Sequence, residues 1–218
     1  MERRNQPASG PLNRPAGLRT LILIPIIHTQ ADMGALSEPI QRMKVAKLGK
    51  KSLERNFELV TRLWTQIEQT LEGLAIPYQR VRVYQDGLPV CGHELEIVSE
   101  LAKAGSRNHQ LLLKLKEKGA TIMGTESSEL LVEEYQLQQQ AFSVPPSKVP
   151  ARAASRGRNL RDSLLQRRDQ FLGARINTTL QQGETGLLFL GMLHSVESWL
   201  AKDIRVVRPI RHLPIHHP

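Results

Sequence analysis

The sequence predicts a single-domain α/β fold in which helices flank a mostly parallel or mixed sheet. Short apolar segments alternate with helical stretches along the chain, and this alternation is typical of parallel strands that are connected by helices. The 218 residues are enough for one sizeable hydrophobic core.

Five apolar segments are predicted as strands: residues 21–27, 80–85, 120–124, 186–190 and 204–208. Four of them run directly or nearly directly into an ionisable residue, in chain order His28, Asp86, Glu126 and His194. A buried strand does not need an ionisable residue at its end. Because ligands of open α/β sheets bind just beyond the carboxyl ends of the strands, this repeated placement predicts one shared site at that edge.

Helices are predicted over residues 36–48, 52–72, 93–104, 107–118, 128–141, 160–181 and 195–200. The second has apolar residues at spacings of three and four, from Leu53 through Trp64 to Leu71, which is typical of a helix face that packs against a core. Ser106 is placed to cap the fourth helix, which ends before Gly119.

The compact domain is predicted over residues 19–209, with one flexible insert in it and one segment on each side of it. Residues 1–18 contain three prolines and are expected to form a disordered basic tail, and residues 143–159 a flexible, basic, Pro-rich insert. Residues 210–218 are expected to form a C-terminal extension. The insert interrupts one domain, because strands with the same kind of end residue lie on both sides of it.

The net charge of +9 is concentrated in the tail and the insert. Residues 1–20 hold four arginines and one glutamate, and residues 141–168 hold seven basic residues and one acidic residue, whereas residues 21–140 hold 14 basic and 15 acidic residues. Basic segments of this kind are usually solvated. We therefore expect no dedicated nucleic-acid binding, and only non-specific contact with nucleic acid through residues 141–168.

Two further features narrow the class of protein. No apolar run approaches the roughly 20 residues of a membrane span, so no membrane partner is expected. Cys91 is the single cysteine, which excludes an internal disulfide and favours a reducing, cytoplasmic location. The sequence leaves the oligomeric state open.

An Arg-Asp pair lies within the predicted helix 160–181. Asp169 falls on the apolar face, four residues after Leu165 and three before Leu172, and Arg168 lies at the border of that face. A buried carboxylate is costly unless it is paired. The pair is therefore either a structural clamp or a group that orients a strand-end histidine and anchors an anionic part of the substrate.

The strand-end residues suit two kinds of chemistry. His28 and His194 can act as general acid and base, with Glu126 and Asp86 orienting them. Alternatively, His28, Glu126 and His194 can hold a divalent metal that activates water. The residue types leave both alternatives open.

Three more residues are candidate substrate-binding groups. Asn108 and His109 begin a predicted helix after Gly105-Ser106, and a helix N-terminus attracts anions. Asp32 lies in the loop that follows the first strand.

Several short strings carry a family resemblance. Arg-Asp-Gln-Phe-Leu-Gly-Ala-Arg-Ile over 168–176 is followed by a strand and by Gly-Met-Leu-His over 191–194. This order resembles the C-terminal signature of the erythromycin esterase/ChaN-like and TraB/PrgY superfamily. In that resemblance, His28 matches the N-terminal strand-end histidine and Glu126 a mid-chain glutamate. More closely, the strings at 28–34, 84–90 and 107–112 look like a group of uncharacterised bacterial proteins.

The resemblance implies an α/β sandwich with a cleft at the strand ends. Members of the superfamily include esterases in which histidine activates water, membrane-linked metal-dependent proteases and a haem-binding group. The chain lacks the helical elaborations of the esterases and the membrane segments of the proteases. We therefore predict a bacterial hydrolase of an unidentified small-molecule or peptide substrate, with or without a divalent metal. The alternative is a non-catalytic protein that binds a ligand or haem in the same cleft.

Overall fold

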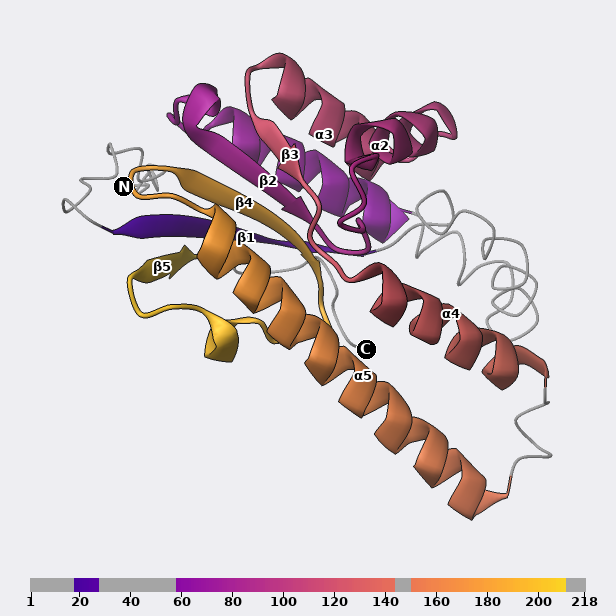
Figure 1. Cartoon of the computed structure of the whole chain (residues 1–218). Coiled ribbons are helices and arrows are strands. Elements are labelled where there is room, and N and C mark those ends of the chain that lie inside the picture. Colours follow the sequence, from indigo (N-terminus) through magenta and orange to yellow (C-terminus); the bar gives the residue numbers. More distant parts are fainter. Residues whose placement is uncertain (1–17, 28–57, 144–149, 211–218) are drawn as a thin grey trace, which may run out of the picture.

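The computed structural model describes residues 18–27, 58–143 and 150–210. Five strands within these ranges form one sheet, and each runs parallel to its neighbours (Figure 1). They are β1 (Arg19–Ile26), β2 (Val81–Gln85), β3 (Thr121–Met123), β4 (Thr185–Gly191) and β5 (Ile204–Val207). Their order in the sheet is β3-β2-β4-β1-β5. The predicted α/β fold is confirmed.

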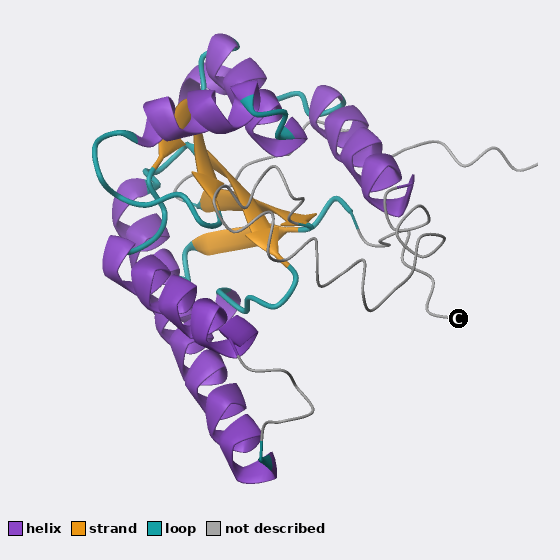
Figure 2. Ribbon diagram, turned by 90° about the vertical axis from the view of Figure 1, so that its right-hand side faces the viewer, coloured by secondary structure: helices purple, strands orange, loops and turns teal. Residues whose placement is uncertain are grey.

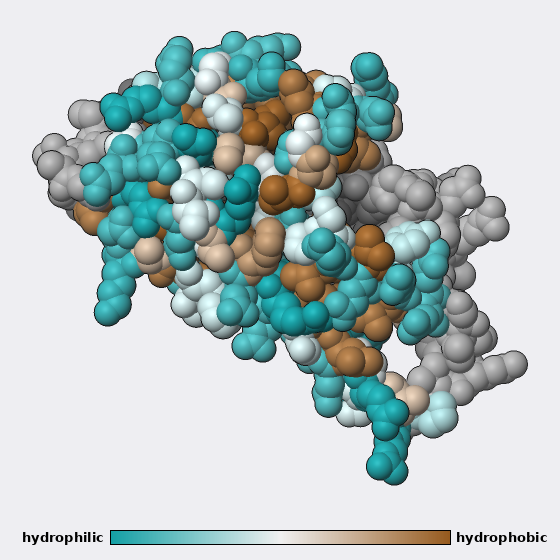
Figure 3. All heavy atoms as spheres, in the orientation of Figure 1, coloured by the Kyte–Doolittle hydropathy of each residue, from teal (hydrophilic) through white to brown (hydrophobic). Residues whose placement is uncertain are grey.

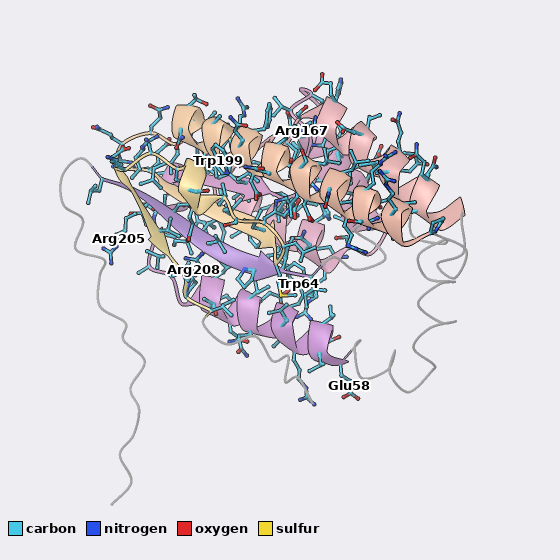
Figure 4. The ribbon with its side chains drawn as sticks, turned by 90° about the horizontal axis from the view of Figure 1, so that it is seen from below. Glu58, Trp64, Arg167, Trp199, Arg205 and Arg208 are labelled. Atoms are coloured by element: carbon cyan, nitrogen blue, oxygen red, sulfur yellow. The ribbon has the colours of Figure 1, made fainter. Side chains whose placement is uncertain are left out.

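Helices cover both faces of the sheet (Figure 2). The helices of the described residues are a helix over 58–72, α2 (Glu94–Lys103), α3 (Arg107–Glu117), α4 (Ser128–Ser143) and α5 (Ala151–Thr179), with the 3₁₀ turns η2 (Tyr78–Arg80) and η4 (Glu197–Trp199). Helix 58–72 and α3 pack on one face, whereas α5 and η4 pack on the other. Trp64 on helix 58–72 and Trp199 on η4 mark the two helical layers, since they lie on opposite sides of the sheet (Figure 4).

The central strands are apolar along their length because both of their faces are buried. In β1, Ile22, Ile24 and Ile26 join the core cluster that contains Trp64, in agreement with the core-packing role predicted for that residue. Leu21 joins the cluster around α5, since successive side chains of a strand point to opposite faces. With both faces covered, the ends of the strands are the places where the sheet can present functional groups.

The basic insert predicted over 143–159 needs a correction in its C-terminal part. The helix predicted from residue 160 begins at Ala151, directly after Pro150, so residues 151–159 are helical. These turns extend away from the sheet, and most of their side chains are exposed (Figure 1). A helix without a buried face has no hydrophobic periodicity, which is why the sequence pattern did not reveal it.

Several predicted features lie outside the described residues. They are His28, Asp32, the helix at 36–48, residues 1–17 of the tail, residues 144–149 of the insert and residues 211–218 of the extension. The segment 195–200, predicted as a helix, contains the single 3₁₀ turn η4. Among the described residues, no helix is both long enough and apolar enough to cross a membrane.

Replacing a glycine of α5 with alanine should change the stability of the protein in opposite directions at two positions. A Cβ at Gly173 would lie 2.5 Å from the Cβ of Trp199, so α5 and η4 would have to move apart. A Cβ at Gly157 would meet nothing within 4 Å. We expect Gly173→Ala to lower the free energy of unfolding by about 1–3 kcal/mol, as overpacking does. Gly157→Ala should raise it by up to about 1 kcal/mol, because alanine is favoured in helices. Urea denaturation measures both changes, and equal effects would contradict the close packing of α5 on η4.

Candidate functional site

Three of the predicted strand-end residues meet at the carboxyl edge of the sheet. Asp86 follows β2, Glu126 follows β3 and His194 follows β4. Each offers a side-chain oxygen or nitrogen to a group of atoms that all lie within 4.8 Å of one another. The three side chains are only 3%, 0% and 5% exposed. The structure thus brings together three of the four residues that the strand ends indicated.

Backbone hydrogen bonds fix the loops that carry two of these side chains. The N–H of Asp86 donates to a carbonyl of β4, so strand pairing continues to the residue that bears the carboxylate. Gly87 then turns the chain with a φ of 79°, which glycine adopts without strain. The N–H groups of Thr125 and Glu126 both donate to the carbonyl of Leu88, which joins the loop after β3 to the loop after β2.

The imidazole of His194 lies between two carboxylates. Its Nδ1 is 2.6 Å from Oδ1 of Asp169 on α5, and its Nε2 is 3.4 Å from Oδ2 of Asp86. The second oxygen of Asp169 accepts the N–H of Ser195 at 2.9 Å, and Oδ2 of Asp86 accepts the N–H of Gly191 at 3.0 Å. The imidazole is therefore oriented on both sides by carboxylates that the backbone holds in place.

Arg168, the neighbour of Asp169 on α5, joins three carboxylates. Its Nε and Nη2 donate to Glu126 at 3.2 and 2.7 Å, and Nη2 also donates to Asp86 at 2.8 Å. Its Nη1 donates to Glu134 of α4 at 2.6 Å. These bonds use four of the five N–H groups of the guanidinium. Arg168 therefore ties α5 to α4 and to the loops after β2 and β3.

These contacts change the protonation of the cluster. Burial acts to lower the pKa of His194, but the hydrogen bonds to Asp169 and Asp86 outweigh burial and raise the pKa to about 9. Burial raises the pKa of Glu126, against the opposing effect of Arg168. Burial disfavours the charge of Arg168, yet its hydrogen bond to Glu126 and the other carboxylates raise the pKa of the guanidinium further. At neutral pH the site therefore holds an imidazolium and a guanidinium among carboxylates.

A pocket of about 540 Å³ opens over the cluster, and Asp86, Arg168 and His194 line it. Its walls come from the end of β1, from α4 and α5 and from the loop after β4. The apolar wall residues include Ile26, Leu131, Tyr135, Leu165, Met192 and Leu193. Apolar side chains also gather on the surface along α4 and α5 (Figure 3). A concave, largely apolar pocket with a few convergent polar groups is the usual form of a small-molecule site.

Among the described residues, Asp86, Glu126 and His194 are close enough together to hold a divalent metal, and carboxylate and imidazole ligands suit Zn²⁺ or Mn²⁺. The fit is poor because Nη2 of Arg168 already lies between the carboxylates of Asp86 and Glu126. A metal ion would have to displace the guanidinium, and His194 would have to lose its proton. Of the two chemistries that the residue types allow, the geometry favours acid–base chemistry by the side chains themselves.

Two of the other predicted site residues, Asn108 and His109, do not join this cluster. Asn108 and His109 lie on α3, which covers the opposite face of the sheet from α5, and neither lines the pocket. Ser106 caps α3 as predicted, and its hydroxyl also bonds to Nδ1 of His109 at 2.6 Å. The amide of Asn108 is buried, and within the described part of the chain neither its oxygen nor its nitrogen has a hydrogen-bond partner. His28 and Asp32 lie outside the described residues.

Two site residues on α4, Glu134 and Gln138, were not predicted from the sequence. Glu134 accepts from Arg168, Nε2 of Gln138 donates to Glu134 at 3.2 Å, and both residues line the pocket. Their spacing of four residues indicates that they share one face of the helix. Nothing in the sequence indicated that this face lies against α5.

Fold and site together define a parallel α/β protein with a histidine–carboxylate–arginine cluster beneath a pocket at the carboxyl edge of the sheet. No protein-family model, curated protein or solved structure matches the chain. The resemblance to the erythromycin esterase/ChaN-like and TraB/PrgY superfamily therefore stays a prediction that rests on the strings quoted above.

Proposed function

We propose that the protein is a hydrolase in which His194 is the general acid and Asp86 the general base. The observation that carries the proposal is the position of the imidazole at the pocket, between a carboxylate that orients Nδ1 and one that faces Nε2. A histidine whose pKa is about 9 is protonated at neutral pH and is suited to donate a proton.

The proposed reaction uses the imidazole of His194 and the carboxylate of Asp86, which faces its Nε2. Water attacks the electrophilic carbon or phosphorus of the substrate, and Asp86 takes up a proton from that water. His194 donates a proton from Nε2 to the leaving oxygen or nitrogen, and the hydroxyl of the water stays on the other product. Transfer of the proton from Asp86 to His194, across 3.4 Å, restores the starting state. Asp169 is a positioning residue, because its bond to Nδ1 directs Nε2 toward the substrate.

A non-catalytic protein that binds a ligand in the same pocket is the second candidate. The observation that favours it is that Arg168, His194 and Asp86 already pair with opposite charges, as they would in a structural clamp. A clamp between the sheet and α5 requires no reaction. Measurements of activity separate the two functions.

Chromogenic substrates of three bond types test the hydrolase. We expect the protein to release the chromophore from at least one of 4-nitrophenyl butyrate, alanine 4-nitroanilide and bis(4-nitrophenyl) phosphate at about pH 7. His194→Gln should lower kcat by about 100-fold or more, because glutamine cannot donate the proton. His93→Gln is the matched control and should leave kcat unchanged, since His93 is exposed and pairs with Glu96 away from the pocket.

Two results would overturn the hydrolase in favour of the binding protein. One is the absence of turnover of all three substrates, and the other is equal turnover by the wild type and His194→Gln. Thermal unfolding of each variant establishes that a loss of activity is not a loss of folding.

Asp169→Asn provides a further readout, because losing this carboxylate lowers the pKa of His194. The alkaline limb of the pH profile of kcat/KM should then move to lower pH.

The pocket and the cysteine support two coarser proposals. The size of the pocket fits a small molecule or one side chain of a peptide as substrate. The single cysteine, Cys91, is exposed and free, which supports a reducing compartment such as the cytoplasm.

A further inference from the structure

The pocket also indicates the chemical class of its ligand. We propose that it takes a neutral or cationic molecule with an apolar body and a hydrogen-bond donor at its polar end, such as a primary amine or amide, in preference to an anion. The inference concerns the ligand class of the site described above. It rests on the proposed function in one respect, because it treats the bound ligand as the substrate.

Carboxylates outnumber cations in the cluster beneath the pocket. The cations are Arg168 and His194. The carboxylates are those of Asp86, Glu126, Glu134 and Asp169. With all six groups ionised the cluster carries an excess of two negative charges, and protonation of Glu126 reduces the excess to one. The excess is negative in either state, and in a partly buried pocket it repels an anion.

Most of the donors of the cluster that could bind an anion are already in use. Four of the five guanidinium N–H groups of Arg168 donate to carboxylates, and both nitrogens of His194 lie beside carboxylates. The backbone N–H groups of Gly191 and Ser195 donate to two of the same carboxylates. An anion would have to break these charge-assisted bonds to enter. This differs from the sequence-based prediction that Arg168 anchors an anionic group.

One acceptor of the pocket, by contrast, lacks a donor. Nε2 of Gln138 donates to the carboxylate of Glu134, and because an ionised carboxylate only accepts, this bond sets the orientation of the amide. The bond thus places the carbonyl oxygen Oε1 on the other side of the amide, where it is buried and has no hydrogen-bond partner among the residues that the structure describes. A buried acceptor without a donor is costly. A ligand N–H that reaches this oxygen, after a small rotation of the flexible side chain, relieves that cost.

The walls of the pocket suit an apolar body. Leu131 and Tyr135 of α4 face the pocket together with Met192 and Leu193 of the loop after β4. Tyr135, Met192 and Leu193 are 37%, 51% and 84% exposed, so a ligand can cover apolar surface that is now in contact with water. Each methylene group that a ligand buries there tightens binding by about fourfold.

Probes that share one apolar body test the proposal directly. Hexylammonium, hexanamide and hexanoate carry a cationic, a neutral and an anionic end on the same chain. Their dissociation constants for the full chain are measured by ligand-observed NMR at about pH 7. We expect hexylammonium and hexanamide to bind, and hexanoate to bind at least about tenfold more weakly than hexylammonium. Butylammonium should bind about 15-fold more weakly than hexylammonium, because two methylene groups are lost.

Neighbouring residues of α4 provide matched variants. Glu134→Gln removes a carboxylate from the pocket and should reduce the difference in affinity between hexylammonium and hexanoate. Glu133→Gln removes a carboxylate that pairs with Arg167 outside the pocket, and it should leave the difference unchanged. Tyr135→Ser should weaken all three probes, whereas Val132→Ser, at an exposed residue that does not line the pocket, should not.

Three results would overturn the ligand class: no binding of any probe at millimolar concentration, a preference for hexanoate, or equal effects of Glu134→Gln and Glu133→Gln. These results are distinct from a failure of the hydrolase. Binding in the expected order without turnover of any chromogenic substrate would retain the ligand class and refute the hydrolase. Turnover together with a preference for the anionic probe would retain the hydrolase and refute the ligand class.

Discussion

Replacing Arg168 with methionine should lower the free energy of unfolding by about 3–5 kcal/mol, because it leaves buried charges without their partner. The guanidinium bonds to Asp86 and Glu126, whose side chains are 3% and 0% exposed. Methionine fills a similar volume but neutralises neither carboxylate. Denaturant unfolding at neutral pH measures the loss.

The adjacent residue provides the control for this prediction. The side chain of Arg167 is 47% exposed and pairs with Glu133 at the surface, and surface ion pairs contribute about 0–1 kcal/mol. Arg167→Met should therefore have little effect. The deficit of Arg168→Met should shrink as the pH falls, because burial favours the protonated form of Glu126 once the guanidinium is absent. Equal losses in the two variants would refute the role of Arg168 as a clamp.

The stability of the wild type should fall by roughly 3 kcal/mol more than that of His194→Gln as the pH rises from about 6 to above 9. The pKa of His194 is raised from 6.5 to about 9 in the folded protein, and each pH unit corresponds to about 1.4 kcal/mol. A raised pKa means that the folded state holds the proton more tightly than the unfolded state. The contribution of His194 to the free energy of unfolding is therefore complete below about pH 6.5 and is lost as the pH rises through about 9.

Urea denaturation of both proteins across this pH range measures the effect. Other groups that titrate near pH 9 are common to the two proteins, so the difference between their curves isolates His194. The same series with His93→Gln, at an exposed histidine, should run parallel to the wild type. Parallel curves for the wild type and His194→Gln would contradict the prediction, because they would show that the two carboxylates beside His194 do not raise its pKa in the folded protein.

The meeting of Asp86, Glu126 and His194 was predictable because parallel strands place their carboxyl ends at one edge of the sheet. In the structure β2 lies between β3 and β4, so the residues that follow these three strands are neighbours. Helical spacing also placed Asp169 on the buried face of α5, where it meets His194. These features follow from local patterns together with a general rule of topology.

The partners of Arg168 were not predictable in this way. Its carboxylates come from residues 82, 42 and 34 positions away along the chain, on two loops and a separate helix. No local pattern links residues at such separations, because their contact depends on how whole elements pack. The exposed first turns of α5 were missed for a related reason, since a helix that buries no face has no periodic apolar residues.

The sequence by itself determined the alternation of strands and helices, the apolar strands that are buried on both faces, and the ionisable residues at the strand ends. Each of these depends on neighbouring residues and on the periods of the backbone, which a linear pattern records. Only the tertiary structure decided which charges neutralise one another. Four of the five N–H groups of Arg168 donate to carboxylates, and Glu134 of α4 adds to a negative excess at the pocket. Charge balance in a buried site is a sum over groups from distant parts of the chain, so it exists only once those groups have come together.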